Sequence, residues 1–254
     1  MLLLDGKNAV VYGGGGSVGG AVARAFARAG ARVFLAGRTA VSLERVAAVI
    51  RAEGGVAETA VVDALDEGAV DDHADGVVAM AGSLDVSLNV IADSDVQGTP
   101  MVEMSLADYL SPVVTAVTSK FLTARAAARH MVRQGSGVIM MFGGTGDRAP
   151  MRAYHLGGLL TAFDAVEAMR RQLAAELGPS GVRVVTLQTS GIPESIPADA
   201  DQRAAIEADL IARTLTGRAA TLADVGDVAV FAASDWARTV TGAAINMTCG
   251  AVLD

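Results

Sequence analysis

The sequence predicts an α/β protein with three layers, in which a doubly wound parallel sheet carries helices on both faces. Short apolar runs alternate with alanine-rich stretches of helical periodicity along the whole chain, as such a sheet requires. The chain also opens with an apolar run, a glycine cluster, a helical pattern and a second apolar run. Neither a repeat nor a linker divides the 254 residues, so we expect a single domain over 1–254.

The first predicted unit is a strand, a tight turn, a helix and a second strand. Residues 9–12 form the first apolar run, and 33–36 form the second. Between them, Val18, Val22 and Phe26 lie four residues apart, on one face of a helix that Gly30 ends. Such a unit opens a nucleotide-binding sheet.

Six glycines fill the turn of this unit, and the pattern G-x-G-x-x-G falls on Gly14, Gly16 and Gly19. Glycines allow the backbone to approach a pyrophosphate closely, and the helix N-terminus offers free N–H groups and a positive dipole end. We therefore expect a nucleotide here; the alternative is a glycine-rich turn without a ligand.

Five further strands are expected at residues 57–62, 86–91, 137–142, 182–187 and 244–247. The least regular segment, 190–217, holds Pro193 and Pro197 and follows a late strand, where open α/β sheets place their ligand crevice. Long loops in compact domains are usually functional, so we interpret 190–217 as a substrate lid; the alternative is a plain surface excursion.

Composition narrows the class of protein. The chain is 52% hydrophobic, with a mean hydropathy of +0.41, but has no apolar run long enough to span a membrane. The opening MLLLDGK is too short for a signal peptide. The single cysteine, Cys249, excludes an intrachain disulfide and indicates a reducing, cytoplasmic setting.

Charge and histidine spacing exclude two kinds of partner. The formal net charge is −8 and no basic cluster occurs, so we expect no nucleic-acid role. His73, His130 and His155 lie far apart without metal-ligand spacing, so we expect no metal site.

The chain resembles the short-chain dehydrogenase/reductase family over nearly its whole length, most closely in segments 4–38, 61–70, 165–185 and 222–254. The family's T-G-x-x-x-G-x-G motif falls on Tyr12, Gly13, Ser17 and Gly19, with Tyr12 and Ser17 departing from it. The resemblance implies a Rossmann-type fold and a nicotinamide dinucleotide. We expect the cofactor to contact Gly13, Ser17, Val18, Gly19, Arg38, Asp63, Ala64, Asn89 and Ile192.

The choice between the two nicotinamide cofactors depends on the end of the second strand. An NAD enzyme needs a carboxylate there for the ribose hydroxyls, but this chain has Gly37 followed by Arg38. A guanidinium pairs with a 2′-phosphate through charge-assisted bonds, so we predict NADP(H). The alternative for Arg38 is an exposed charge at a strand end. Asn89, by resemblance, either lines the ribose or only braces the sheet.

The resemblance implies four catalytic positions, normally asparagine, serine, tyrosine and lysine. Here they match Ala116, Gly143, Leu159 and Phe163, because the helix after residue 159 matches the family without gaps. Tyr154 is a candidate acid from the preceding loop, tuned by His155 or Arg148; the alternative is a tyrosine that packs over the pocket. His155 is the second candidate to carry a proton, and its alternative is a loop histidine with a structural role.

Other polar residues near the crevice allow more than one reading. Asp93 and Asp95 follow the fourth strand and are either acid/base carboxylates or turn formers. Arg148 either tunes Tyr154 or forms a solvated pair with Asp147 that contributes little to stability. Of the two lysines, Lys7 precedes the first strand and Lys120 lies in a helix near Ala116.

Three functions remain open. The first is an NADP(H)-dependent oxidoreductase with an altered proton donor, acting on a small apolar or activated carbonyl, enone or imine. The second is a non-redox cyclase, isomerase or dehydratase on the same fold, and the third is a non-catalytic subunit. The apolar helix 162–177 and tail 239–253 lead us to expect a homo-oligomer, a tetramer or dimer, as the family commonly forms.

Overall fold

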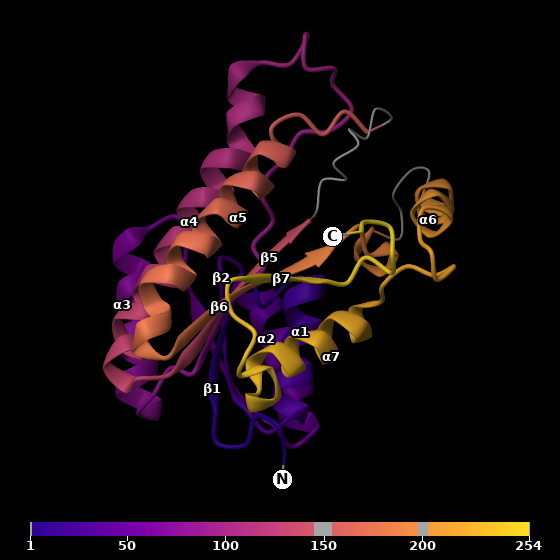
Figure 1. Ribbon diagram of the computed structural model, residues 1–254. Coiled ribbons are helices and arrows are strands. Elements are labelled where there is room, and N and C mark those ends of the chain that lie inside the picture. Colours follow the sequence, from indigo (N-terminus) through magenta and orange to yellow (C-terminus); the bar gives the residue numbers. More distant parts are fainter. Residues whose placement is uncertain (1, 145–153, 198–202, 254) are drawn as a thin grey trace.

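The computed structural model describes residues 2–144, 154–197 and 203–253, and these form one α/β domain with a central sheet between two helical layers (Figure 1). The seven-stranded sheet is parallel throughout its described pairings, in the order β3-β2-β1-β4-β5-β6-β7. The strands are β1 (Asn8–Tyr12), β2 (Arg32–Gly37), β3 (Val56–Val61), β4 (Val86–Asn89), β5 (Gly137–Gly144), β6 (Val182–Thr189) and β7 (Ala243–Asn246).

The helices divide between the two faces of the sheet. One layer contains α1 (Ser17–Arg28), α2 (Ala40–Ala52) and α7 (Leu222–Ala233). The other contains α3 (Glu67–Ala81), α4 (Leu106–Gln134) and α5 (Leu159–Leu177). The short α6 (Arg203–Ala212) stands apart from both layers, beyond the carboxyl ends of the strands (Figure 1). The predicted three-layer, doubly wound fold is confirmed.

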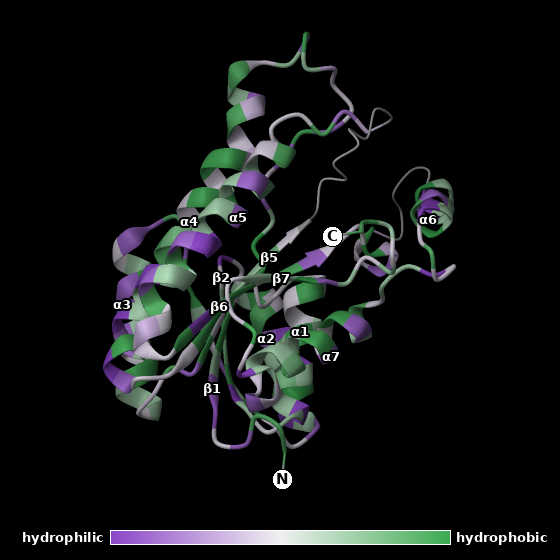
Figure 2. Ribbon diagram, viewed as in Figure 1, coloured by the Kyte–Doolittle hydropathy of each residue, from purple (hydrophilic) through white to green (hydrophobic). Residues whose placement is uncertain are grey.

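Alternate residues of each central strand enter opposite cores. In β1, Ala9 and Val11 pack toward α1 and α7, whereas Val10 and Tyr12 pack toward α3 and α4. Burial of both strand faces explains why the central strands are continuous apolar runs rather than alternating ones. Figure 2 shows the apolar strands in the interior and hydrophilic residues on the outer faces of the helices.

Each predicted strand is present, and the bounds differ where side chains or pairing change them. β4 ends at Asn89 rather than residue 91, because Asn89 Oδ1 accepts a hydrogen bond from the backbone N–H of Ile91, 3.0 Å away. β5 and β6 run further than predicted, since they pair as far as Gly144 and Thr189. Strand β1 lies between β2 and β4, so the order reverses there and opens a crevice at the carboxyl ends.

The predicted lid lies at this edge. Within its described parts, 190–197 and 203–217, it contains a short 3-10 turn, Pro193–Ser195, and helix α6. Residues 198–202 of the lid, and Asp147 and Arg148, lie outside the described residues. None of the described helices has the length and apolar character needed to cross a membrane.

Candidate active site

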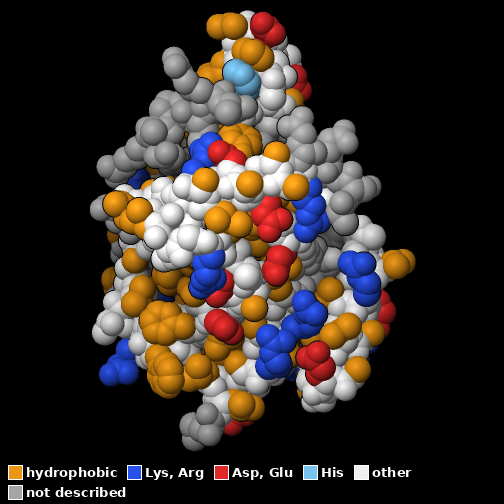
Figure 3. Space-filling model, turned by 90° about the vertical axis from the view of Figure 1, so that its right-hand side faces the viewer, with side chains coloured by type: hydrophobic (Ala, Val, Ile, Leu, Met, Phe, Trp, Pro, Cys, Tyr) orange, Lys and Arg blue, Asp and Glu red, His pale blue; other side chains and the backbone are white. Residues whose placement is uncertain are grey.

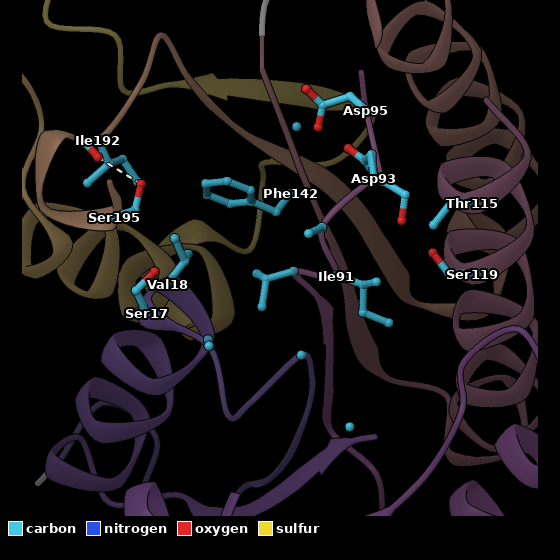
Figure 4. A pocket seen from close by; sticks show the side chains of 18 of the residues that line it. Ser17, Val18, Ile91, Asp93, Asp95, Thr115, Ser119, Phe142, Ile192 and Ser195 are labelled. Carbon is cyan, nitrogen blue, oxygen red and sulfur yellow. Dashed lines mark hydrogen bonds between the residues drawn. The ribbon is translucent and has the colours of Figure 1, made fainter. Parts of the chain in front are cut away.

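A cavity of about 820 Å³ opens at the carboxyl ends of the strands. It extends from the glycine turn after β1, past the ends of β2 and β3, to the ends of β4 and β5 and the start of α5. In Figure 4, Ser17 and Val18 of α1 and Ile192 and Ser195 lie on one side. Asp93, Asp95 and the α4 residues Thr115 and Ser119 lie on the other side, so one cavity joins the glycine turn to a polar corner.

The glycine turn is shaped by contacts that exclude side chains. Gly13 has a φ of +86°, and a Cβ there would lie 3.0 Å from the carbonyl carbon of Val90. A Cβ on Gly19 would lie 2.2 Å from the carbonyl oxygen of Gly13, so only glycine fits. These contacts bring α1 close to the end of β1 and point its first turn at the cavity.

The N-terminus of α1 is free to bind an anion. Gly16 occupies the N-cap position, and no side chain caps the helix. Ser17, Val18 and Gly19 all line the cavity. Uncapped N–H groups at a helix N-terminus beside a close backbone turn fit the pyrophosphate of a dinucleotide.

Arg38 lines the cavity directly after β2. Its side chain is exposed and lines the cavity together with Thr39 and Ser42. Within the described residues, Arg38 has no ion pair or side-chain hydrogen bond, and β2 ends in Gly37 rather than a carboxylate. The arrangement fits a phosphate on the adenosine ribose.

The remaining expected cofactor residues fall into two groups. Asp63 and Ala64, which follow β3, and Ile192, which is buried after β6, line the cavity. Asn89 is buried behind the wall, where its side-chain amide donates to Thr123 Oγ1 at 3.1 Å. The contacts that Asn89 makes are therefore those of a brace between β4 and α4.

The cavity wall is apolar where the family's catalytic groups were matched. Gly143, Leu159 and Phe163 line it, next to Phe142. Ala116 is fully buried in the core between α4 and the sheet. A Cβ on Gly143 would approach Thr186 Cγ2 no closer than 3.5 Å, so the space for a side chain exists there.

Tyr154 lines the cavity, but its hydroxyl faces the lid segment. It donates a hydrogen bond to Asp209 Oδ2 of α6, 2.5 Å away. Burial and then the Asp209 carboxylate raise the pKa of Tyr154 above its ordinary value. His155, the other expected catalytic residue, is exposed with a φ of +45°, and among the described residues it is not part of the cavity wall.

The polar corner contains an ion pair that sequence reasoning missed. Lys120 Nζ of α4 lies 2.6 Å from Asp93 Oδ1, after β4, and the Lys120 side chain is only 1% exposed. The sequence makes Asp93 a candidate and places Lys120 near Ala116, but it does not indicate that the two form a pair. The available signal was spacing, because Lys120 lies one helical turn after Ala116.

The face in Figure 3, which looks onto the right-hand side of Figure 1, mixes charges of both signs. Lys and Arg side chains stand beside Asp and Glu there, with hydrophobic side chains between them. Part-exposed ion pairs of the molecule include Arg213 with Asp209 and Arg218 with Asp224.

Comparisons with known proteins agree with this fold and cavity. Residues 14–251 match the family model described as enoyl-(acyl carrier protein) reductase. D-threitol dehydrogenase of Mycolicibacterium smegmatis is 30% identical over 94% of this chain and 90% of its own length.

Solved structures give the same result. A short-chain type dehydrogenase/reductase from Mycobacterium marinum superposes with a TM-score of 0.87 at 26% identity, over 99% of this chain and 97% of that one. A gluconate 5-dehydrogenase from Burkholderia cenocepacia J2315, in complex with NADP and tartrate, superposes with a TM-score of 0.87 at 25% identity. It covers 98% of this chain and 96% of that one.

The chain therefore belongs to the short-chain dehydrogenase/reductase family.

Proposed function

We propose that this protein is an oxidoreductase that uses NADP(H) to reduce, or form, a carbonyl, enone or imine group on a small, largely apolar molecule. The observation that carries the proposal is the single cavity that joins the uncapped N-terminus of α1 and Arg38 to an apolar wall at β5 and α5. The NADP of the gluconate dehydrogenase neighbour and the dehydrogenase activity in the relatives' names support it.

Each part of the cavity has a role in this proposal. The amides of α1 and the Ser17 hydroxyl hold the pyrophosphate, and Arg38 with Ser42 holds the 2′-phosphate. Asp63 and Ala64 contact the adenine, and Ile192 packs against the nicotinamide end. When bound, the nicotinamide exchanges a hydride with the substrate carbon. Phe142, Leu159 and Phe163 exclude water from that carbon.

The lid proposal assigns Tyr154 a positioning role. Ile206 and Leu210 of α6 line the cavity, so the described part of the segment that contains α6 forms part of its wall. The hydrogen bond from Tyr154 to Asp209 ties that wall to the start of α5. The alternative is direct proton transfer by Tyr154 or His155. A Tyr154→Phe variant distinguishes a positioning role of Tyr154 from proton transfer by it.

The test is turnover with quantified stoichiometry. Purified protein is incubated with NADPH and a panel of carbonyl, enone and imine compounds, and both NADPH loss and product are measured. The proposal expects one NADPH consumed per product formed. Product without cofactor consumption would show a non-redox enzyme instead, and neither reaction, with intact NADPH binding, would favour a non-catalytic subunit.

We also propose a cytoplasmic homo-oligomer. Strand β7 is a sheet edge that pairs only with β6 among the described strands, and Trp236 near it is 71% exposed. On α5, buried Glu167 Oε1 and Arg170 Nη1 have no hydrogen-bond partner among the described residues. Light scattering at micromolar protein should give a dimer or tetramer mass, and a monomer mass contradicts the proposal.

A further inference from the structure

Lys120 is a buried cation whose partner, Asp93, lines the cavity. Its side chain is 1% exposed on α4, and its ammonium lies 2.6 Å from the carboxylate of Asp93. Burial of an ammonium is costly unless a partner neutralises it. The stability of this position therefore depends on Asp93, and the pair behaves as one unit.

Asp93 faces both Lys120 and the cavity. Its side chain is 11% exposed and lines the cavity, with Oδ1 on Lys120. Within the described residues, no hydrogen bond engages its second oxygen, Oδ2. The next residue, Ser94, has a φ of +57°, and its carbonyl oxygen accepts a hydrogen bond from Ser111 Oγ of α4 at 3.0 Å. The backbone beside Asp93 is thus fixed to α4.

A second polar group, which precedes Lys120 in the sequence, has no partner among the described residues. The Ser119 hydroxyl is buried and has no hydrogen-bond partner among the described residues, although Ser119 lines the cavity. Ser119 and Thr115 lie on the same side of the cavity as Asp93 (Figure 4). Buried hydroxyls are normally hydrogen-bonded, so an unpaired one on a cavity wall indicates a place for a polar ligand atom.

We propose that Asp93, held by Lys120, is the catalytic residue that exchanges a proton with the substrate oxygen or nitrogen, which Ser119 binds. This inference rests on the proposed function and names its proton-transfer group. It does not depend on Tyr154 or His155.

The reaction balances with a nicotinamide dinucleotide as oxidant. In alcohol oxidation, the substrate O–H bond breaks and its proton goes to Asp93 Oδ2, while the C–H bond breaks and its electron pair leaves as a hydride to the oxidised nicotinamide. A C=O bond forms. The carboxylic acid then returns its proton to solvent. In the reverse direction the same carboxyl group protonates the oxygen.

The charges around Asp93 set when it carries a proton. Lys120 faces it from α4, and Asp95 lies on its own segment. Burial raises the pKa of Asp93 above its ordinary value, Lys120 opposes that rise, and Asp95 adds slightly to it. Loss of Lys120 therefore raises the pKa of Asp93 further, because the charge that opposes the rise is removed. Alcohol oxidation needs the ionised form of Asp93. In the variant that lacks Lys120, the rate of this reaction therefore begins to fall at a higher pH as the solution is acidified.

The first readout needs neither cofactor nor turnover. Carboxyl ¹³C NMR of the full-length protein, labelled at aspartate, follows each carboxyl signal against pH. We expect one aspartate signal with a raised titration midpoint. This signal should be missing in Asp93→Asn, and its midpoint should lie at least one pH unit higher in Lys120→Met. An Asp93 signal with an ordinary midpoint that Lys120→Met leaves in place would overturn the pairing.

The second readout is kinetic. Asp93→Asn should lower kcat by about 10²- to 10⁴-fold while NADPH affinity stays unchanged, and Ser119→Ala should mainly raise KM. Lys120→Met should move the acidic side of the pH profile of kcat/KM for alcohol oxidation to higher pH. The size of this move should equal the change in the Asp93 midpoint seen in the NMR titration. An Asp93→Asn variant that turns over like wild type overturns the inference and leaves the proposed oxidoreductase standing.

Matched controls exclude general damage. Lys7, the other lysine, lies before β1 and pairs weakly with Asp85, so Lys7→Met should leave kcat and its pH profile unchanged. Asp227 of α7 is exposed and away from the cavity, so Asp227→Asn controls for a lost carboxylate. If Asp93→Asn fails to fold, the Asp93→Asn/Lys120→Met double variant removes both charges and carries the test. A wild-type protein that does not bind NADPH would instead refute the proposed function. The NMR test would still be valid, because it needs no cofactor.

Discussion

The hydroxyl of Tyr154, which precedes α5, donates a 2.5 Å hydrogen bond to the carboxylate of Asp209 on α6, 55 residues further along the chain. Arg213 completes this contact: its guanidinium pairs with Asp209 at 2.9 Å and lies 5.4 Å from the centre of the Tyr154 ring. The hydrogen bond from Tyr154 is the main reason that the pKa of Asp209 is lowered from its ordinary value. The contact therefore holds a wall of the cavity in place.

Removing the Tyr154 hydroxyl tests whether this tyrosine positions the lid or moves a proton. We expect Tyr154→Phe to raise KM by about 3- to 10-fold with little change in kcat, because one hydrogen bond to a charged, part-exposed group is lost. Steady-state kinetics decide the matter. Tyr109→Phe, which removes the hydroxyl bonded to Thr161 away from the cavity, is the matched control. A fall of kcat by 100-fold or more would make Tyr154 the proton donor.

Arg38 decides the cofactor preference in this account. We expect Arg38→Glu to weaken NADPH binding by about 100-fold, since a charge-assisted pair becomes a repulsion, while NADH binding holds or improves. Fluorescence titration with both cofactors gives the two constants. Arg45→Glu, an equal change on the exposed face of α2 outside the cavity wall, should alter neither. If Arg38→Glu leaves the preference as it was, the assignment of Arg38 is wrong.

Gly19 controls the close contact between α1 and the glycine turn. An alanine Cβ there meets the Gly13 carbonyl oxygen at 2.2 Å, so Gly19→Ala must shift backbone. We expect loss of measurable NADPH binding and a destabilisation of about 2 kcal/mol or more. Thermal unfolding and titration measure both effects.

Gly76 of α3, in contrast to Gly19, has space for a side chain. Nothing lies within 4 Å of a Cβ at this exposed helical position, so Gly76→Ala should stabilise the protein by about 0.5–1 kcal/mol and leave cofactor binding intact. Equal behaviour of the two variants would contradict the steric argument.

His73 makes stability depend on pH. It lies against Tyr12, with its Nδ1 3.2 Å from the hydroxyl, and burial lowers the pKa of His73 from 6.5 to about 4. Between pH 6.5 and 4 the unfolded chain binds the extra proton, so the free energy of unfolding falls as pH falls through this window and is unaffected above it. From pH 7 to pH 5, the free energy of unfolding falls by about 2 kcal/mol because of His73.

Urea denaturation of wild type and His73→Gln at pH 7 and pH 5 measures this effect. Glutamine retains a hydrogen-bonding side chain but does not titrate, so the variant should lose less stability than wild type over the same interval. Parallel losses in the two proteins would show that His73 titrates alike in the folded and unfolded chains.

The fold was predictable because its signals are local and repeated. The central strands, such as β1, β4 and β6, are buried on both faces and so appear as apolar runs, and the helices between strands repeat their apolar residues every three to four positions. The glycine turn was equally visible, since the steric demands at Gly13 and Gly19 are met within a few residues of chain.

The polar corner was not predictable in the same way. Lys120 and Asp93 are 27 residues apart, and their meeting depends on which face of the 29-residue helix α4 turns toward the end of β4. Asn89 and Thr123 illustrate the same limit. Their 3.1 Å hydrogen bond joins β4 to α4, and the periodicity of the sequence does not tell how these two elements are rotated relative to each other. The pattern predicts that α4 is buried, but not which polar side chains its buried face brings to the cavity.

The most direct test of the central claim, a cavity built for NADP(H), is isothermal titration calorimetry of the unmodified protein with NADPH and with NADH. We expect one site per chain that binds NADPH at least about tenfold more tightly than NADH, a difference of about 1.4 kcal/mol. Binding of neither cofactor, or equal binding of both, would contradict the account.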